Sequence, residues 1–145
     1  MLRIALLLSV ITLASVVLLN VLITTDRELV EADVGRLVEL ARQGGDEAVD
    51  GILASLADDY RGTHPFSRDR IVRGLERYVG QGRLELLETG GYQSLWVGDE
   101  IMIPILRLHA RTRDGHEGNL LLRIVYAERA GEWRIVDISR YELGR

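Results

Sequence analysis

The sequence has no cysteine and no lysine, which limits the side chains available for catalysis, metal binding and cross-linking. Without cysteine there can be no disulfide, no thiolate nucleophile and no cysteine-ligated metal. All 18 basic residues are arginine, which we attribute to the base composition of the genome rather than to a ligand. The net charge is −4, whereas nucleic-acid-binding proteins need surplus positive charge to replace counterions. The composition therefore argues against a nucleic-acid partner.

The spacing patterns of common catalytic and metal sites are also absent. His64, His109 and His116 have no ligand-like spacing with one another or with a pair of carboxylates. No glycine-rich phosphate loop follows a predicted strand, and no serine occupies a nucleophile elbow. We therefore predict no metal site and no cofactor. The 145 residues are enough for one domain.

The first 25 residues contain the long apolar run of the chain. After Arg3, residues 4–25 carry no charged side chain. About 20 apolar residues at about 1.5 Å each extend over about 30 Å, the thickness of a bilayer's hydrocarbon core. The alternative is a cleaved signal peptide, whose apolar core is only about 7–15 residues long and ends in a small-x-small site. Residues 21–25 offer no such site, so we predict a transmembrane anchor over residues 1–25.

The charges that flank the apolar run bear on its orientation. Arg3 and the free amine lie on one side, and Asp26, Glu28 and Glu31 lie on the other, together with Arg27. The positive-inside bias then favours an amino terminus in the cytoplasm and a domain outside it. We predict a single-pass membrane protein that contacts the bilayer through its apolar run. A cleaved leader would make the protein secreted instead.

Three amphipathic helices are predicted after the apolar run. The first covers residues 25–43, and its initial threonine with Glu28 three residues later has the pattern of a capping box. The second covers residues 46–60. The third covers residues 68–80, with Ser67 as its expected N-cap. The third helix carries arginines that could contact lipid phosphates, but we interpret them as a solvated face.

The second half of the chain has the pattern of antiparallel strands. Two short strands are predicted over residues 84–88 and 93–97, as a hairpin that turns at two glycines between them. Three long strands follow over residues 101–113, 119–129 and 133–142. Glycines in the two connecting segments supply the positive φ that short hairpin loops need. We therefore predict an α+β fold for residues 26–145, with three helices packed on a curved antiparallel sheet of four to five strands.

Two positions decide which side chains of these strands face the core. Ile103 and Leu106 have opposite parity, and Pro104 between them cannot donate to a strand ladder. A bulge at Pro104 would place both apolar residues on one face and turn His109 away from the core. Asp137 shares the parity of core residues in the last strand. Either a second bulge turns Asp137 outward, or its carboxylate points into the interior.

Two stretches resemble a known family. Residues 131–136, Gly-Glu-Trp-Arg-Ile-Val, look like the last hairpin of that family. Residues 58–62, Asp-Asp-Tyr-Arg-Gly, precede an arginine-rich helix and look like the junction before its third helix. With the order of the predicted elements, they resemble the NTF2-like (SnoaL-like, cystatin-like) α+β cone over residues 26–143. The resemblance implies a cone-shaped cavity between helices and sheet, and frequent dimers through the outer face of the sheet.

Two functions fit this resemblance. The first is a membrane-tethered binding or assembly module that forms a homodimer through the outer face of the sheet. The self-association face would consist of Leu121, Arg123, Val125 and Ala127. The alternative is a small isomerase or cyclase that acts on an apolar ligand inside the cone.

The enzymes of this family place a carboxylate near a tyrosine, a histidine or a second carboxylate inside the cone. No such set can be carried onto this sequence position by position. The nearest catalytic candidates are Asp137, His109 and Tyr60. Under the assembly hypothesis, the tyrosines and tryptophans simply fill the core.

Overall fold

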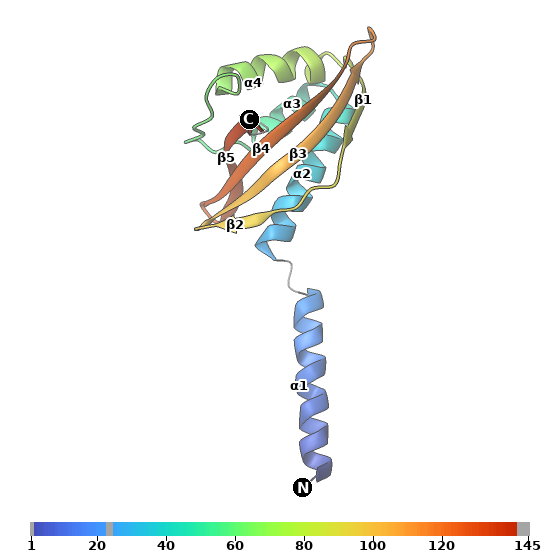
Figure 1. Cartoon of the computed structure of the whole chain (residues 1–145), viewed down its shortest axis with the longest axis vertical. Coiled ribbons are helices and arrows are strands. Elements are labelled where there is room, and N and C mark those ends of the chain that lie inside the picture. Colours follow the sequence, from blue (N-terminus) through green and yellow to red (C-terminus); the bar gives the residue numbers. More distant parts are fainter. Residues whose placement is uncertain (1, 23–24, 142–145) are drawn as a thin grey trace.

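The chain consists of an apolar N-terminal helix followed by an α+β domain (Figure 1). The computed structural model describes residues 2–22 and 25–141, with the side chains of Leu2 and of residues 20–22 left out. Residues 1, 23, 24 and 142–145 lie outside the described part. Residues 1, 23 and 24 of the predicted anchor and the predicted last residue of the final strand, Glu142, fall among them.

Helix α1 (Leu2–Leu22) exposes its apolar side chains along the part that the structure describes. The hydroxyl groups of Ser9, Thr12 and Ser15 donate to carbonyl oxygens four residues earlier, at 2.8–2.9 Å, so they are satisfied within the helix. Among the described residues, none of the helices has both the length and the apolar character that crossing a membrane requires. The transmembrane helix expected within residues 1–25 is therefore not confirmed.

Helix α2 (Asp26–Gln43) begins at the predicted capping box. The Thr25 hydroxyl accepts from the Glu28 backbone N–H at 3.3 Å, and the Glu28 carboxylate accepts from the Thr25 N–H at 2.8 Å. Two of the free N–H groups at the helix start are satisfied in this way. The valines spaced four residues apart on the inner stripe are buried against the sheet. The first predicted domain helix is thus confirmed.

The second predicted helix is shorter than expected. Helix α3 (Asp46–Leu53) ends seven residues before the predicted end at Tyr60. The segment that follows runs beside strand β5 (Glu132–Arg140). The Ile135 N–H donates to the Ser55 carbonyl, and the Ile135 carbonyl accepts from the Ala57 N–H, both at 2.8 Å. These bonds satisfy backbone groups at the edge of the sheet, which a continued helix would have left without protein partners.

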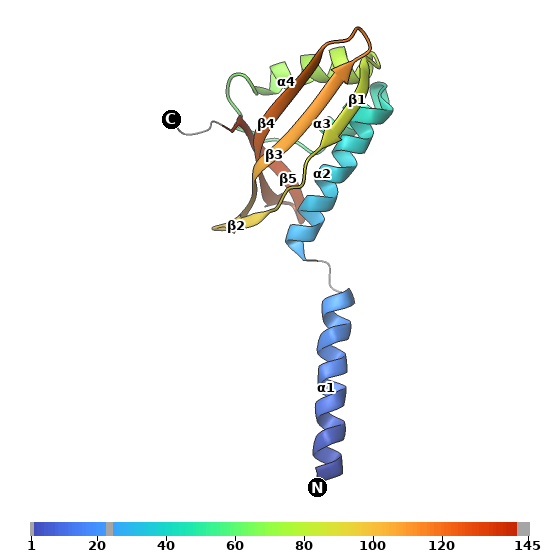
Figure 2. The ribbon, with the colours of Figure 1, turned by 45° about the vertical axis from the view of Figure 1, so that its right-hand side comes forward.

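The third predicted helix is present but changes its winding. Helix α4 (Arg68–Leu75) continues into the π-helical segment η1 (Glu76–Gly80). Ser67 occupies the predicted N-cap position, but its side chain makes no capping hydrogen bond. Figures 1 and 2 show α4 at the end of the domain that lies farthest from α1.

The described strands form one antiparallel sheet in the order β1-β3-β4-β5, and β2 also pairs with β3. The remaining strands are β1 (Leu84–Thr89), β2 (Leu95–Val97), β3 (Glu100–Thr112) and β4 (Glu117–Arg129). The predicted hairpin between the first two strands is wrong. Both pair with β3, with β1 along its second half and β2 at its start.

Two register shifts decide the faces of the two positions that the sequence analysis raised, one predicted at Pro104 and one left open at Asp137. One lies between Ile103 and Leu106 of β3, around Pro104. It brings both apolar side chains into the same buried cluster, so the predicted bulge is confirmed. The other lies in the pairing of β4 with β5, around Val136.

The core lies between the inner face of the sheet and the helical layer. Its largest fully buried side chains come from both layers and include Val30 and Val34 of α2 with Ile101, Ile103 and Tyr126 of the sheet. A smaller cluster joins α3, the π-helical segment and β1. The predicted α+β class is confirmed.

Candidate functional site

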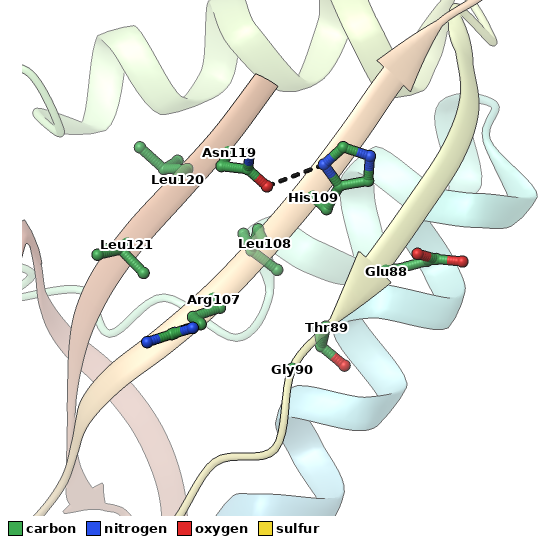
Figure 3. Close-up of a pocket in the computed structure, with 9 residues that line it drawn as sticks. All are labelled: Glu88, Thr89, Gly90, Arg107, Leu108, His109, Asn119, Leu120 and Leu121. Atoms are coloured by element: carbon green, nitrogen blue, oxygen red, sulfur yellow. Dashed lines mark hydrogen bonds between the residues drawn. The ribbon is translucent and has the colours of Figure 1, made fainter. Parts of the chain in front are cut away.

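A hollow of about 620 Å³ lies on the outer face of the sheet, opposite the helices (Figure 3). Glu88, His109 and Asn119 form one row across it, because they are direct partners on β1, β3 and β4. Arg107 and Leu121 form the next row. Cross-strand partners share a face of the sheet, so all five side chains belong to the outer face.

His109 is held within this hollow by two contacts from β4. Its Nδ1 lies 2.9 Å from Asn119 Oδ1, and its Nε2 lies 2.7 Å from Glu117 Oε1. A neutral imidazole donates through one nitrogen only, so both contacts need a protonated ring or the Asn119 amide turned over. Both partners are surface side chains, and the His109 side chain points away from the core. The histidine is therefore part of the outer surface.

The other two catalytic candidates lie at the opposite edge of the sheet. Asp137 is paired with Val125, on the outer face, so the second register shift turns it outward. The Tyr60 hydroxyl donates to the Phe66 carbonyl at 2.7 Å. Burial raises the pKa of Tyr60 to about 12, and the negative charge of Asp137 acts in the same direction.

The three candidates do not form one site. His109 is paired with Asn119 and Asp137 with Val125, six residues farther along β4. At about 3.3 Å per residue, that separation is about 20 Å. A proton-transfer set needs side chains within about 3 Å of one another or of a shared substrate atom. Only Tyr60 and Asp137 are close enough to affect each other electrostatically.

A polar network that the sequence analysis did not identify lies between α2 and the sheet. The Tyr126 hydroxyl donates to Asp33 at 2.9 Å, and Arg36 donates to the other Asp33 oxygen at 2.7 Å. Arg36 also donates to the Ser55 hydroxyl at 2.6 Å. Burial raises the pKa of Tyr126 well above its usual range, and the Asp33 charge adds to this shift. Tyr126 therefore serves as a hydrogen-bond donor that joins β4 to α2.

One signal in the sequence could have revealed this network. Asp33 lies three residues after Val30 and four before Leu37, on the apolar stripe of α2. A carboxylate in that position needs a donor from the facing layer. The donor, Tyr126, is distant in the chain, so the pattern indicates that a partner exists without identifying it.

The centre of the core between the helices and the sheet is made of packed apolar side chains. The ring of Tyr126 and the side chains of Ile101 and Ile103 are fully buried there. Within the described ranges, no group of three or more histidine or acidic side chains could hold a metal ion. The interior at these positions is packed with apolar side chains, while a hollow of about 380 Å³ lies between α2 and β5 beside the Asp33 network.

The predicted self-association face is partly available. Arg123 is exposed, and Leu121 and Val125 are half-buried on the outer face of β4. Ala127 is not exposed, because it packs with Ala57 and Val136 in a small buried cluster. The segment after α3 that runs beside β5 provides Ala57, so the prediction for Ala127 was wrong. The accessible part of the face runs from Leu121 to Val125.

Solved structures of other proteins share the fold of this chain. No protein-family model and no curated protein matches the sequence. An NTF2-like protein from Cytophaga hutchinsonii superposes with a TM-score of 0.61 at 11% identity, over 81% of this chain and 100% of that one. The fold is NTF2-like. An NTF2-like protein of unknown function from Pseudomonas putida KT2440 has a TM-score of 0.55 at 18% identity, over 76% of this chain and 84% of that one.

A protein of unknown function with a cystatin-like fold, from Nostoc punctiforme, has a TM-score of 0.52 at 15% identity, over 74% of this chain and 86% of that one. All three identities are low, so the comparisons establish the NTF2-like fold and leave the function to the surface of this chain. The predicted fold resemblance is confirmed at that level.

Proposed function

We propose that this protein is an NTF2-like binding or assembly module that α1 holds at a lipid bilayer. The observation that carries the proposal is the surface of α1. Eleven large apolar side chains between Ile4 and Leu19 are each about half exposed or more. Arg3 is the one charged residue of the helix. Such a surface is far larger than an ordinary exposed apolar patch, and it calls for an apolar partner.

The energetics favour lipid as that partner. Burial of each large aliphatic side chain is worth about 1.5–3 kcal/mol, and the domain buries none of these residues in α1. The hydroxyl groups of the helix are bonded to its own backbone, so they add little cost in lipid. The charge pattern, with Arg3 in the first turn of α1 and acidic residues after the helix, supports a domain outside the cytoplasm.

The assembly surface in this proposal is the outer face of the sheet. Leu121 and Val125 supply apolar area there, and Arg107 and Arg123 are exposed beside them. Among the described residues, these two arginines form no ion pair within 4 Å. An apolar patch with a polar rim that carries arginine is typical of a protein interface. A second copy of the chain is the proposed partner.

The isomerase or cyclase alternative has less support. It requires Asp137 inside a hollow cone, but Asp137 pairs with Val125 on the outer face. Tyr126 and its apolar neighbours are packed together in the core, away from Asp137. We therefore take the assembly module as the function that the geometry favours.

Vesicle flotation tests the attachment to lipid. The full chain, mixed with phosphatidylcholine vesicles, should float with them in a density gradient and stay bound in 1 M salt, since the attraction is apolar. A matched variant carries Leu8→Arg and Leu13→Arg, both on the exposed surface of α1. Each arginine costs about 2.5–3.5 kcal/mol at the centre of a membrane helix, so the variant should remain at the bottom. The proposal is wrong if the native chain does not float, or if both proteins float alike.

A further inference from the structure

Strand β2 exposes apolar side chains on both of its faces. Leu95, Trp96 and Val97 are 40%, 48% and 49% exposed. Successive side chains of a strand point to opposite faces, so Trp96 faces one way and its two neighbours the other. The strand pairs with β3 along one edge, and Figures 1 and 2 show it projecting from the body of the domain. We call these three residues the β2 patch.

Contacts with the first turns of α2 place the β2 patch at the α1 end of the domain. Arg27 Nε donates to Ser94 Oγ at 3.2 Å. Glu31 accepts from the same hydroxyl at 2.6 Å and from the Ser94 N–H at 3.1 Å. Ser94 is buried and directly precedes Leu95 in the chain. These bonds fix the start of β2 against the beginning of α2.

The tryptophans provide a second link to the same place. The ring of Trp96 meets the ring of Trp133 edge to face, with centroids 5.6 Å apart. The Trp133 indole N–H donates to Asp26 Oδ1 at 3.2 Å. Asp26 is the first residue of α2 and comes four residues after the end of α1 at Leu22. Four residues span at most about 14 Å, so the patch lies close to the level at which α1 ends.

The chemistry of the patch suits the headgroup region of a bilayer. Tryptophan is enriched at membrane–water interfaces because its ring is apolar and its N–H is polar. Aliphatic neighbours on the other face of β2 would add contact with the acyl boundary. Charges of both signs lie beside the patch, because Arg27 and Glu31 both bond to Ser94. A zwitterionic headgroup, which also carries both signs, suits this surface.

We propose that the β2 patch lies in the headgroup region of the bilayer that holds α1. The inference rests on the proposed attachment of α1 to lipid and adds an orientation to it. The domain then has two points of contact with lipid, the end of α1 and β2. The end that carries α4 faces away from the membrane (Figures 1 and 2). Its arginines, Arg70, Arg73 and Arg77, do not reach the same bilayer.

Fluorescence quenching in the full chain tests this orientation. The chain has two tryptophans, so Trp133→Phe leaves Trp96 as the single reporter. A matched reporter for the far end carries Trp96→Phe, Trp133→Phe and Tyr78→Trp, since Tyr78 is exposed after α4. Both proteins are bound to phosphatidylcholine vesicles, with or without lipid brominated on the acyl chain near the headgroup. Iodide serves as the quencher from the aqueous side.

We expect brominated lipid to quench Trp96 and to leave the tryptophan at position 78 unchanged. Iodide should quench the reporter at position 78 several-fold more strongly than Trp96. If the chain floats with vesicles but Trp96 is open to iodide and insensitive to brominated lipid, the orientation is wrong and the attachment of α1 stands. Protection from iodide without quenching by brominated lipid would also overturn it, because protein would then cover the patch. A chain that does not float overturns the attachment and this inference together.

Discussion

At the level of single residues, the absence of lysine and cysteine leaves the alkaline titration to the tyrosines. Arginine keeps its charge beyond pH 12, and no other side chain of this protein changes charge between about pH 9 and 12. Burial raises the pKa of Tyr60 to about 12, with help from Asp137. Burial also raises the pKa of Tyr92 and of Tyr126, which lie near Glu31 and Asp33 respectively.

We therefore expect the free energy of unfolding to fall as the pH rises from about 10 to 12. The unfolded chain releases the Tyr60 proton near pH 10, whereas the folded protein holds it to about pH 12. Stability from this group is complete below pH 10 and is lost as pH approaches the folded pKa. Urea unfolding between pH 9 and 12 measures the slope, which Tyr60→Phe should reduce. Tyr78→Phe, at an exposed tyrosine, is the control. An equally steep slope in the Tyr60→Phe protein would contradict the assignment.

Asp33 is a partly buried carboxylate that has hydrogen-bond partners from two elements. Asp33 lies on the buried stripe of α2, and its two oxygens accept from Tyr126 and Arg36. The loss of either donor would leave a partly buried carboxylate without a bond that it now has. This network joins a helix to a strand and stabilises the contact between the two layers.

At the level of elements, two helices with similar N-cap sequences begin in different ways. Thr25 and Ser67 both adopt the extended backbone of an N-cap residue. The Thr25 side chain accepts from the backbone of Glu28, while the Ser67 side chain makes no capping bond. The same residue class thus contributes differently, because only the first helix completes the reciprocal pair of the capping box.

Alanine substitutions should separate these two caps. Thr25→Ala should lower the free energy of unfolding by about 1 kcal/mol, the usual cost of losing an N-cap. Ser67→Ala should change it by less than about 0.5 kcal/mol, as for other surface positions. Urea unfolding of the two variants beside the native protein gives the comparison. Equal losses would mean that the cap hydrogen bond is not what stabilises α2.

The segment after α3 is not helical because it pairs with the edge of β5. Its sequence continues the apolar stripe of a helix, with Leu56 and Ala57 in helical spacing from Leu53. In the fold, both residues are buried beside β5 instead, and Leu56 forms a parallel bridge with Ile135. The backbone groups at the edge of β5 outweigh a helical preference of a few tenths of a kcal/mol per residue.

At the level of the whole molecule, the two proposed contact surfaces lie on different parts of the domain. The β2 patch lies beside the beginning of α2, near α1, while the accessible association face runs along the middle of β4. Contact with lipid through the first would leave the second free. Attachment to one surface also concentrates the protein in two dimensions, which favours association of identical faces.

Charge placed on the outer face should weaken self-association. Leu121→Arg introduces a cation into the half-buried apolar part of the face, and in a two-fold contact it does so on both copies. We expect sedimentation velocity of the full chain in detergent to show a dimer for the native protein and a shift toward monomer for the variant. Leu29→Arg, at an exposed leucine of α2, is the control and should leave the dimer intact. A native chain that stays monomeric at high concentration removes the proposed partner.

Local patterns in the sequence were enough to predict the α+β class, the capping box of α2 and the bulge at Pro104. They also predicted the outward position of His109, once the bulge was assumed. These features follow from hydrophobic period, cap chemistry and the missing proline N–H, all of which act over a few residues. The same local reasoning identified the long apolar stretch whose exposure on α1 now carries the proposed function.

How distant segments meet could be learned from the folded chain alone. The fold paired β1 and β2 with β3 rather than with each other, ended α3 at Leu53, and covered Ala127 with Ala57. It also brought Tyr126 to Asp33 and separated His109 from Asp137. The physical reason is common to all of these. Each depends on which backbone edge or buried polar group needs a partner in space, and a local pattern shows that need without showing what meets it.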